Sequence, residues 1–515
     1  MEELPIHQKG EQKTRREIDL NSPIPVDTFG GRVHVKWDEE ALVTPFGQLA
    51  FFIEFLKTSG VYNDWVDKCP MVFNSPNAPS KLNILGTTFL SILAGHKRYS
   101  HMTSIRCDSV STSLLGMSKA VSEDSVRRAF SNNVEEEAGA KWLKESFSQT
   151  YYPLLNEPWI LDVDTTIKLL YGNQEGAVVG YNPRKPGRPS HTYHSYMIAN
   201  IRLMLDVEVR AGNENAAKYT APGLWDFFEK LPKTHWPKFI RGDSGFGTDA
   251  IMTEAENKDL PYLFKLKQTK NVTRLINYCL LENDWEQAGQ GWQGIESTLL
   301  LHGWKRSRRV IILRRPLPKE IVAIKKQQGS GQLEIQFADM DTDMKFYEFA
   351  VLVTSLKDEI STIAQHYRDR ADSENVFDEL KNQWGWQGFT TQDLKRSQIM
   401  ARIIALIYNW WTLFVRLINP KKHTEALTSR PLLLHAVGKQ TSHANQKLLS
   451  VSSAHGKHRY IHLRLTRLAG FFKTLQINAE QLTSIERWCH ILSLAFIKYL
   501  RGRILKPPDL IAAMA

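Results

Sequence analysis

Cysteine is scarce in this chain, whose 515 residues include only Cys69, Cys107, Cys279 and Cys489. None of them forms a C-x-x-C pair, which argues against a disulfide framework and against a zinc site. Long hydrophobic runs are also absent, since no apolar stretch reaches the roughly 20 residues of a membrane span. The polar N-terminus lacks the pattern of a secretory signal. We therefore expect a cytoplasmic protein without a membrane partner.

Acidic residues are few at the C-terminal end of the chain. Residues 391–515 hold 19 Lys and Arg against 5 Asp and Glu, whereas residues 1–390 hold 47 against 50. A basic C-terminal region on a near-neutral body predicts a polyanionic partner, of which nucleic acid is the simplest. A helical domain with a basic surface has the same composition, so both interpretations stay open.

The N-terminal part of the chain divides into two predicted regions. Residues 1–40 are polar and contain three prolines, so we expect a flexible arm. Residues 41–150 have helical periodicity, and Ser122 is the predicted N-cap of a helix that carries Arg127 and Arg128. This pattern fits a helix-turn-helix DNA-binding region, and it fits a small helical bundle equally well.

Farther along, strands alternate with helices, which predicts an α/β core. Residues 159–166 are a predicted strand, whose alternation places Asp162 and Asp164 on one face. Two such carboxylates are costly to bury without a cation, so metal binding is one interpretation. A polar strand end is the other, and without further motifs it is the better one. Asp243 follows a second apolar strand, residues 239–242, between glycines expected to let the backbone turn sharply.

A charged segment near residue 370 carries the most information. Residues 365–381 contain no Gly or Pro, which predicts one continuous helix. At 100° per residue, Tyr367, Arg370, Glu374 and Lys381 fall within an arc of roughly 60°. A face with a carboxylate, two cations and a phenol suits a site that holds a divalent metal and binds phosphates. The alternative is a solvated charged face.

The spacing Tyr-x2-Arg-x3-Glu-x6-Lys resembles the signature of the insertion-sequence-four superfamily of bacterial cut-and-paste transposases. The Gly- and Pro-rich runs at residues 172–177 and 180–190 resemble the thirteen-eighty branch of that superfamily. This resemblance implies a DDE-type transposase whose catalytic acids are Asp164, Asp243 and Glu374.

The resemblance also implies a fold and a division into domains. The expected fold is α/β, with a ribonuclease-H-like catalytic core made of residues 151–269 and 346–395. A mostly β insertion, residues 270–345, interrupts the core. Helical N- and C-terminal regions flank it, and the C-terminal one, residues 396–515, is basic.

Three carboxylates of this kind hold two Mg²⁺ ions, for which Mn²⁺ substitutes, against a scissile phosphate. Asp162 is the alternative to Asp164 as the first ligand, and Asp164 is preferred because Asp-Thr-Thr fits the superfamily's Asp-x-Thr pattern. The residues expected to bind DNA phosphates are Tyr367, Arg370, Lys381, Arg184, Lys185 and Arg188. The candidates for stacking on an unpaired base are Trp285, Trp292 and Trp304, and core packing is the alternative for each.

The implied reaction is cut-and-paste transposition, with end binding, strand cleavage through a hairpin intermediate, and strand transfer. Its partners are double-stranded DNA, as terminal inverted repeats and as target, and a second copy of the chain in a synaptic homodimer at a bacterial nucleoid. Two other classes stay open. One is a catalytically inactive transposase-derived DNA-binding protein. The other is a carboxylate hydrolase such as a glycosidase, which the basic C-terminus disfavours.

Overall fold

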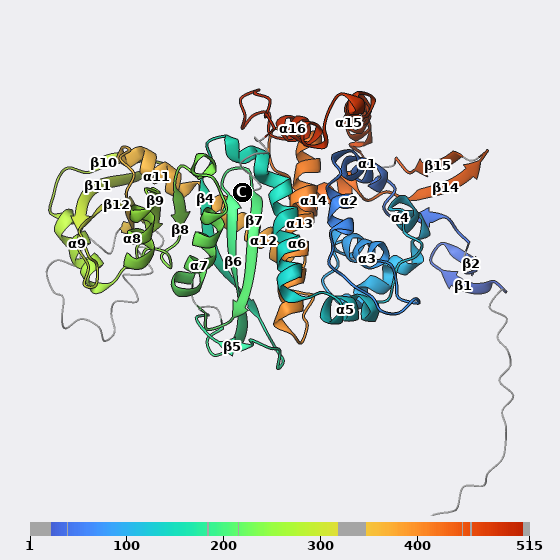
Figure 1. The fold of residues 1–515 in the computed structure, drawn as a ribbon, viewed down its shortest axis with the longest axis horizontal. Coiled ribbons are helices and arrows are strands. Elements are labelled where there is room, and N and C mark those ends of the chain that lie inside the picture. Colours follow the sequence, from blue (N-terminus) through green and yellow to red (C-terminus); the bar gives the residue numbers. More distant parts are fainter. Residues whose placement is uncertain are drawn as a thin grey trace, which may run out of the picture.

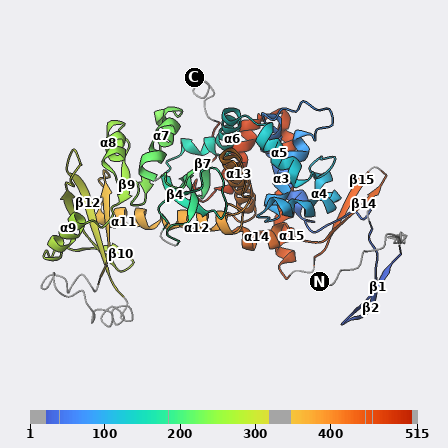
Figure 2. The ribbon, with the colours of Figure 1, turned by 90° about the horizontal axis from the view of Figure 1, so that it is seen from below.

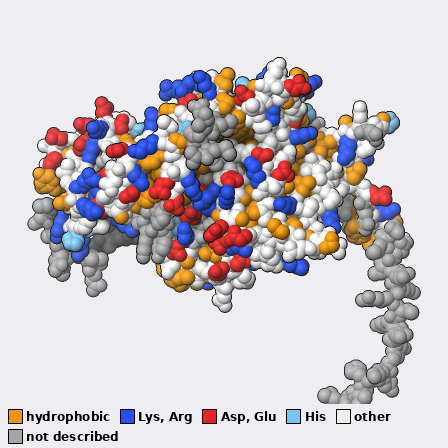
Figure 3. All heavy atoms as spheres, viewed as in Figure 1, with side chains coloured by type: hydrophobic (Ala, Val, Ile, Leu, Met, Phe, Trp, Pro, Cys, Tyr) orange, Lys and Arg blue, Asp and Glu red, His pale blue; other side chains and the backbone are white. Residues whose placement is uncertain are grey.

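The computed structural model describes residues 22–38, 40–182, 185–214, 216–317, 347–444, 446–453 and 456–507. Along its long axis, a strand-rich end leads through a central group of long strands to a mostly helical end (Figure 1). On the face seen in Figure 3, Lys and Arg side chains are interspersed with Asp and Glu side chains.

The N-terminal region is helical after its first strands. Its helices are α1 (Leu49–Ser59), α2 (Val61–Asp67), α3 (Lys81–Leu93), η1 (Tyr99–Cys107), α4 (Ser109–Leu114), α5 (Glu123–Asn132), α6 (Glu136–Tyr151) and η2 (Tyr152–Asn156). Ser122 is the N-cap of α5, as the sequence predicts, because its side chain accepts a hydrogen bond from the Ser125 backbone N–H. Val126 and Phe130 of α5 are fully buried, so this helix is docked on the core through its apolar face.

Two β-hairpins lie where the sequence predicts none. β1 (Ile24–Thr28) and β2 (Gly31–Val35) pair antiparallel within the segment expected to be a flexible arm. β14 (Gly438–His443) and β15 (Gln446–Val451) pair within the C-terminal region expected to be helical, and β14 also pairs with β3 (Val43–Thr44). Residues with positive φ, Gly31 and Ala444, lie at the two turns, as tight hairpin turns require.

A ten-stranded mixed sheet forms the rest of the body. Its strands are β4 (Leu161–Leu169), β5 (Val178–Val179), β6 (Pro189–Ile198), β7 (Leu203–Ala211), β8 (Ile240–Gly242), β9 (Tyr262–Lys265), β10 (Glu286–Gly289), β11 (Trp292–Leu299), β12 (Arg308–Pro316) and β13 (Tyr347–Thr354). β7, β6 and β4 pair antiparallel, whereas β4, β8 and β9 pair in parallel. β13, β12, β11 and β10 follow antiparallel beyond β9. The described strands of the expected insertion therefore extend the central sheet.

Helices cover both faces of this sheet. They are α7 (Ala216–Glu229), η3 (Lys233–His235), α8 (Asp249–Asn257), α9 (Lys270–Leu280), α11 (Ile360–Arg368) and α12 (Ala371–Asn382). α11 and α12 follow one another across one face, with α7 and α8 on the other (Figure 2). The alternation of β12 explains this arrangement, because Ile311 packs with Ile363 of α11 while Ile312 packs into the main core.

The long helix α13 (Leu394–Ile418) lies against β7 and α6. By length and composition it is the one described helix that passes for a membrane span, yet 94% of its most apolar window is buried inside the protein. Its Asn409 side chain bonds both backbone groups of Met204 in β7, at 2.9 and 2.7 Å. α13 is therefore a core helix.

The C-terminal helices pack near α13 and α1 (Figure 1). They are α14 (Ala426–Leu433), α15 (His458–Ile477), η5 (Asn478–Glu480) and α16 (Ser484–Ala495). Phe55 of α1 lies close to the rings of Phe472 in α15 and Trp488 in α16, with centroids 6.3 and 6.2 Å apart. The two ends of the chain thus share one aromatic core.

Candidate functional site

The strands β4, β8 and β9 pair in parallel through Leu161–Val163, Ile240–Gly242 and Tyr262–Phe264, so the polar residues that directly follow these paired segments meet at one edge of the sheet. A cavity of about 470 Å³ opens at this edge. Its lining residues are Asp164, Asp243, Ser244, Lys265, Leu266, Lys267, Gln268, Tyr367, Arg370 and Glu374.

The three acids singled out in the sequence therefore lie around one cavity. Asp164 comes from the middle of β4, Asp243 directly follows β8, and Glu374 lies in the first turn of α12. Tyr367 also lines the cavity, whereas Lys381 is not among the described residues that do so.

The signature segment is two helices, so the prediction of one continuous helix is wrong. α11 ends at Arg368 and α12 begins at Ala371. The Arg370 N–H donates to the Tyr367 carbonyl at 3.1 Å, while the His366 carbonyl, its partner in a regular α-helix, accepts a hydrogen bond from the Arg241 guanidinium. A side chain that enters the helical hydrogen-bond ladder in this way breaks the helix.

The two aspartates of β4 have different surroundings. Asp162 is 2% exposed, and its carboxylate accepts hydrogen bonds from Arg241 at 2.5 and 2.7 Å and from the Ser373 hydroxyl at 2.7 Å. Asp164 lines the cavity, where its Oδ2 contacts Arg370. Asp162, the alternative first ligand, is thus already engaged by internal partners, and it is not among the described lining residues.

Arg370 forms ion pairs with two of the three acids in the cavity wall. Its guanidinium contacts the Asp164 carboxylate and lies 3.3 Å from Glu374 Oε1. Burial raises the pKa of Asp164 to about 7; Arg370 opposes this rise and the Asp243 carboxylate adds to it. Burial also raises the pKa of Tyr367 to about 12. The raised pKa of Asp164 thus comes mainly from burial of its carboxyl, and the nearby Asp243 carboxylate adds to it.

The donor chemistry of the cavity suits a divalent cation, because three carboxylates are hard oxygen ligands of the kind that Mg²⁺ and Mn²⁺ prefer. Among the residues that the structure describes, however, no three His, Cys, Asp or Glu side chains are grouped closely enough to hold an ion. Arg370 contacts two of the three acids, so a cation would take over the role of its guanidinium there.

Two lysines in the cavity wall escaped the sequence reasoning. Lys265 ends β9, and Lys267 follows it two residues later, exposed to solvent. They lie near Asp243 because β9 pairs in parallel with β8, and no local pattern in the sequence shows which strands pair.

The described cations of the basic loop predicted to bind phosphates contact an aromatic ring. Lys185 and Arg188 lie over the ring of Tyr171, with cation-to-centroid distances of 5.8 and 4.8 Å. Neither is among the described residues that line the cavity. Arg184 lies outside the described residues.

An arginine guanidinium lies over the ring of each of the three tryptophans proposed for base stacking. The pairs are Trp285 with Arg314 at 3.8 Å, Trp292 with Arg315 at 4.8 Å and Trp304 with Arg308 at 5.1 Å. Trp285 and Trp304 pack against the main core. Trp292 packs against a second, smaller core cluster. It also lines a second cavity, of about 250 Å³, that shares Lys265, Tyr367, Arg370 and Glu374 with the first. Trp292 is therefore the one of the three that lines a cavity together with one of the acids, Glu374.

Comparisons with known proteins give two findings. The model of the family described as "Transposase DDE domain group 1" matches residues 77–471. The solved structure titled "Cryo-EM structure of piggyBac transposase synaptic complex with hairpin DNA (SNHP)" is similar at 10% identity, with a TM-score of 0.39, over 91% of this chain and 86% of that chain. No curated protein matches the sequence.

Proposed function

We propose, from the premise that the chain belongs to the transposase DDE domain group 1 family, that it catalyses metal-dependent cut-and-paste transposition of an insertion sequence. The observation that carries this proposal is the convergence of Asp164, Asp243 and Glu374, far apart in the chain, on one cavity. In this proposal the three are the catalytic acids, and the protein belongs to the thirteen-eighty branch of the insertion-sequence-four superfamily.

The strand arrangement supports a ribonuclease-H-like core. The antiparallel strands β7, β6 and β4 continue into the parallel strands β8 and β9, which is the strand order of that fold. The first acid then lies on the central strand, and the last lies on a helix packed across the sheet.

Asp164, Asp243 and Glu374 would hold two Mg²⁺ ions, with Mn²⁺ as a substitute. When bound, the ions stabilise charge on the attacked phosphate and lower the pKa of the attacking hydroxyl or water. The side chains of the protein orient the DNA phosphates. Arg370, freed from Asp164, and Tyr367 are placed to hold phosphate oxygens.

Other cations extend the DNA contact beyond the acids. Lys265 and Lys267 line the cavity, and Lys185 and Arg188 present a basic loop. Lys381, Arg184 and the solvent-exposed cations of the basic region 396–515 complete the proposed surface for terminal inverted repeats and target DNA, whereas the buried Arg402 of that region is not part of it. Two ends must be joined, so we propose a synaptic homodimer and a hairpin intermediate, in the cytoplasm of a bacterium at its nucleoid.

Trp292 is the residue that we assign to base stacking. We expect Trp292→Ala to slow the release of the second strand about tenfold, in line with the free energy of stacking one base on an aromatic ring, while first-strand nicking is retained. The measurement is the quenching of 2-aminopurine at the cleaved end, which stacking on Trp292 produces. Trp292→Phe is the control and should retain most of the quenching, whereas unchanged quenching in Trp292→Ala would contradict the assignment.

The proposed function is tested by incubating the purified chain with duplex DNA that carries the terminal repeats flanking its coding sequence. Cleavage at the repeat ends is expected with Mg²⁺ or Mn²⁺, and none with EDTA. Binding should weaken steeply as salt concentration rises. Tight end binding without cleavage in either metal would instead identify a catalytically inactive DNA-binding protein.

A further inference from the structure

A buried ion pair joins the elements that carry the three acids. Asp162 of β4 and Arg241 of β8, with side chains 1% and 0% exposed, pair across two parallel strands. The same carboxylate accepts the Ser373 hydroxyl of α12 at 2.7 Å, and the same guanidinium donates to the His366 carbonyl of α11. These four groups are named the brace.

Each member of the brace is a close sequence neighbour of a residue that lines the acid cavity. Asp162 and Arg241 each precede an acid by two residues, which on a strand places both side chains on the same face. The His366 and Ser373 groups each directly precede a cavity residue. The four couples are Asp162 with Asp164, Arg241 with Asp243, His366 with Tyr367, and Ser373 with Glu374.

We propose that the brace is a positioning device that sets the separation of Asp164, Asp243 and Glu374, and thereby their affinity for a divalent cation. This inference rests on the proposed function. Asp162 and Arg241 act through the elements they join, since neither lines the cavity among the residues described.

Stability alone does not account for such a pair. Removing two charges from water is costly, and well-packed apolar residues of similar volume often replace a buried ion pair without loss of stability. Apolar side chains cannot bond the His366 carbonyl or the Ser373 hydroxyl, however. Compared with an apolar pair, the charged pair therefore adds the hydrogen bonds that tie β4 to α12 and β8 to α11.

The bond to the His366 carbonyl has a direct effect on geometry. Because Arg241 takes this carbonyl, the Arg370 N–H donates to the Tyr367 carbonyl instead. In the next turn the Ser373 N–H donates to the Arg370 carbonyl at 2.9 Å. These are three-residue bonds, which wind the chain more tightly than an α-helix. Without Arg241, the regular ladder would re-form and rotate Glu374 about the helix axis, away from its present direction.

The chain offers a matched control pair. Arg402 of α13 and Asp206 of β7, with side chains 4% and 10% exposed, also form two hydrogen bonds, at 2.8 and 3.0 Å. Like the brace pair, they link a strand to a neighbouring element. Neither is among the described residues that line the acid cavity.

The test compares two double variants, Asp162→Leu with Arg241→Met and Asp206→Leu with Arg402→Met. The measurements are the melting temperature, Mn²⁺ binding to the metal-free protein by electron paramagnetic resonance, and single-turnover cleavage. Both variants should melt close to the wild type. The brace variant should lose about tenfold or more in Mn²⁺ affinity and about 100-fold in cleavage rate, and the control variant should keep both.

Wild-type Mn²⁺ affinity in the brace variant would overturn the proposal. If that variant does not fold, Arg241→Lys replaces it, because Lys keeps the buried charge without the planar fork that reaches two partners. It should fold with weakened Mn²⁺ binding, and unchanged binding would again overturn the proposal. A wild-type protein that neither binds Mn²⁺ nor cleaves DNA would instead overturn the proposed function.

Discussion

Replacing Glu374 with Gln, or Asp164 or Asp243 with Asn, should reduce strand cleavage on the order of 10³-fold or more while DNA-end binding changes little. Each amide keeps the shape of the acid but loses the charge that a divalent cation needs, and the transition state of phosphate cleavage depends on that charge. Single-turnover cleavage of a labelled duplex end measures the first quantity, and fluorescence anisotropy of the same duplex measures the second.

Asp372→Asn is the matched control for these substitutions. Asp372 lies two residues before Glu374 on α12, but its carboxylate pairs with Arg202 at 2.7 Å, and it is not among the described residues that line the cavity. Cleavage by this variant should stay near the wild-type rate. If Glu374→Gln cleaves as fast as Asp372→Asn, Glu374 is not a catalytic acid.

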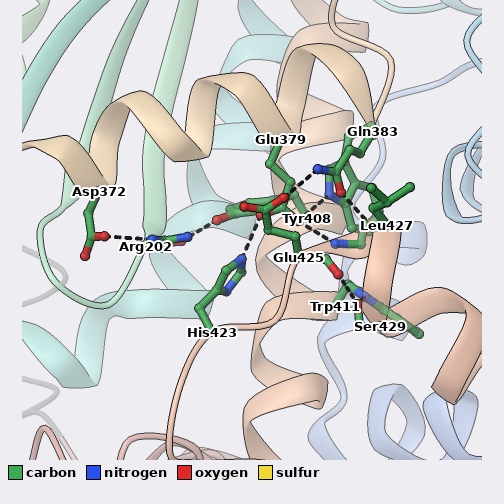
Figure 4. A network of polar contacts seen from close by, with 12 residues as sticks. Arg202, Asp372, Glu379, Gln383, Tyr408, Trp411, His423, Glu425, Leu427 and Ser429 are labelled. Carbon is green, nitrogen blue, oxygen red and sulfur yellow. Dashed lines mark hydrogen bonds and ion pairs between the residues drawn. The ribbon is translucent and has the colours of Figure 1, made fainter.

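Replacing Glu379 with Ala should destabilise the protein by about 3–5 kcal/mol. Its carboxylate is 1% exposed and links α12 to the segment before α14 (Figure 4). It accepts hydrogen bonds from His423 Nε2 at 2.7 Å, Trp384 Nε1 at 3.1 Å and the Ala426 backbone N–H at 3.0 Å. The truncation leaves these donors buried without an acceptor.

The pH dependence gives this prediction a second readout. Burial acts to raise the pKa of Glu379, but its bonds to His423 and Trp384 outweigh burial, so the pKa lies below its ordinary value of 4.5. In acid the unfolded chain therefore binds more protons than the folded chain. The stabilisation that Glu379 contributes is complete above about pH 4.5, and it is lost as the pH falls through the pKa that Glu379 has in the folded protein. The difference in free energy of unfolding between the wild type and Glu379→Ala should therefore shrink as the pH falls below about 4.5.

Urea unfolding followed by tryptophan fluorescence at several pH values measures both effects. Asp378→Ala is the control, because Asp378 is the preceding residue of the same helix and is exposed. Its stability should lie within about 0.5 kcal/mol of the wild type. A loss below 1 kcal/mol for Glu379→Ala at pH 7 would show that the contacts in Figure 4 do not hold α12 in place.

The periodicity of the middle of the chain was enough to predict its α/β character, and the resemblance of residues 367–381 to a transposase signature singled out the three acids that line one cavity. Asp164 and Asp243 follow apolar strand patterns, and such patterns depend only on residues that are neighbours in sequence. The role of the glycines beside Asp243 was judged less well. Gly242 has no positive φ, but a Cβ there would lie 2.9 Å from the Phe246 ring and 3.0 Å from Val163. This glycine serves close packing.

The sequence by itself therefore determined the order of the acids along the chain and the strands that carry or precede Asp164 and Asp243. Three features were decided only by contacts between distant segments: the break between α11 and α12, the engagement of Asp162, and the convergence of Lys265 with the acids. Each depends on where one strand or helix is packed against another. Arg241 can take the His366 carbonyl only after β8 and α11 have come together, and no periodicity within either segment records that meeting.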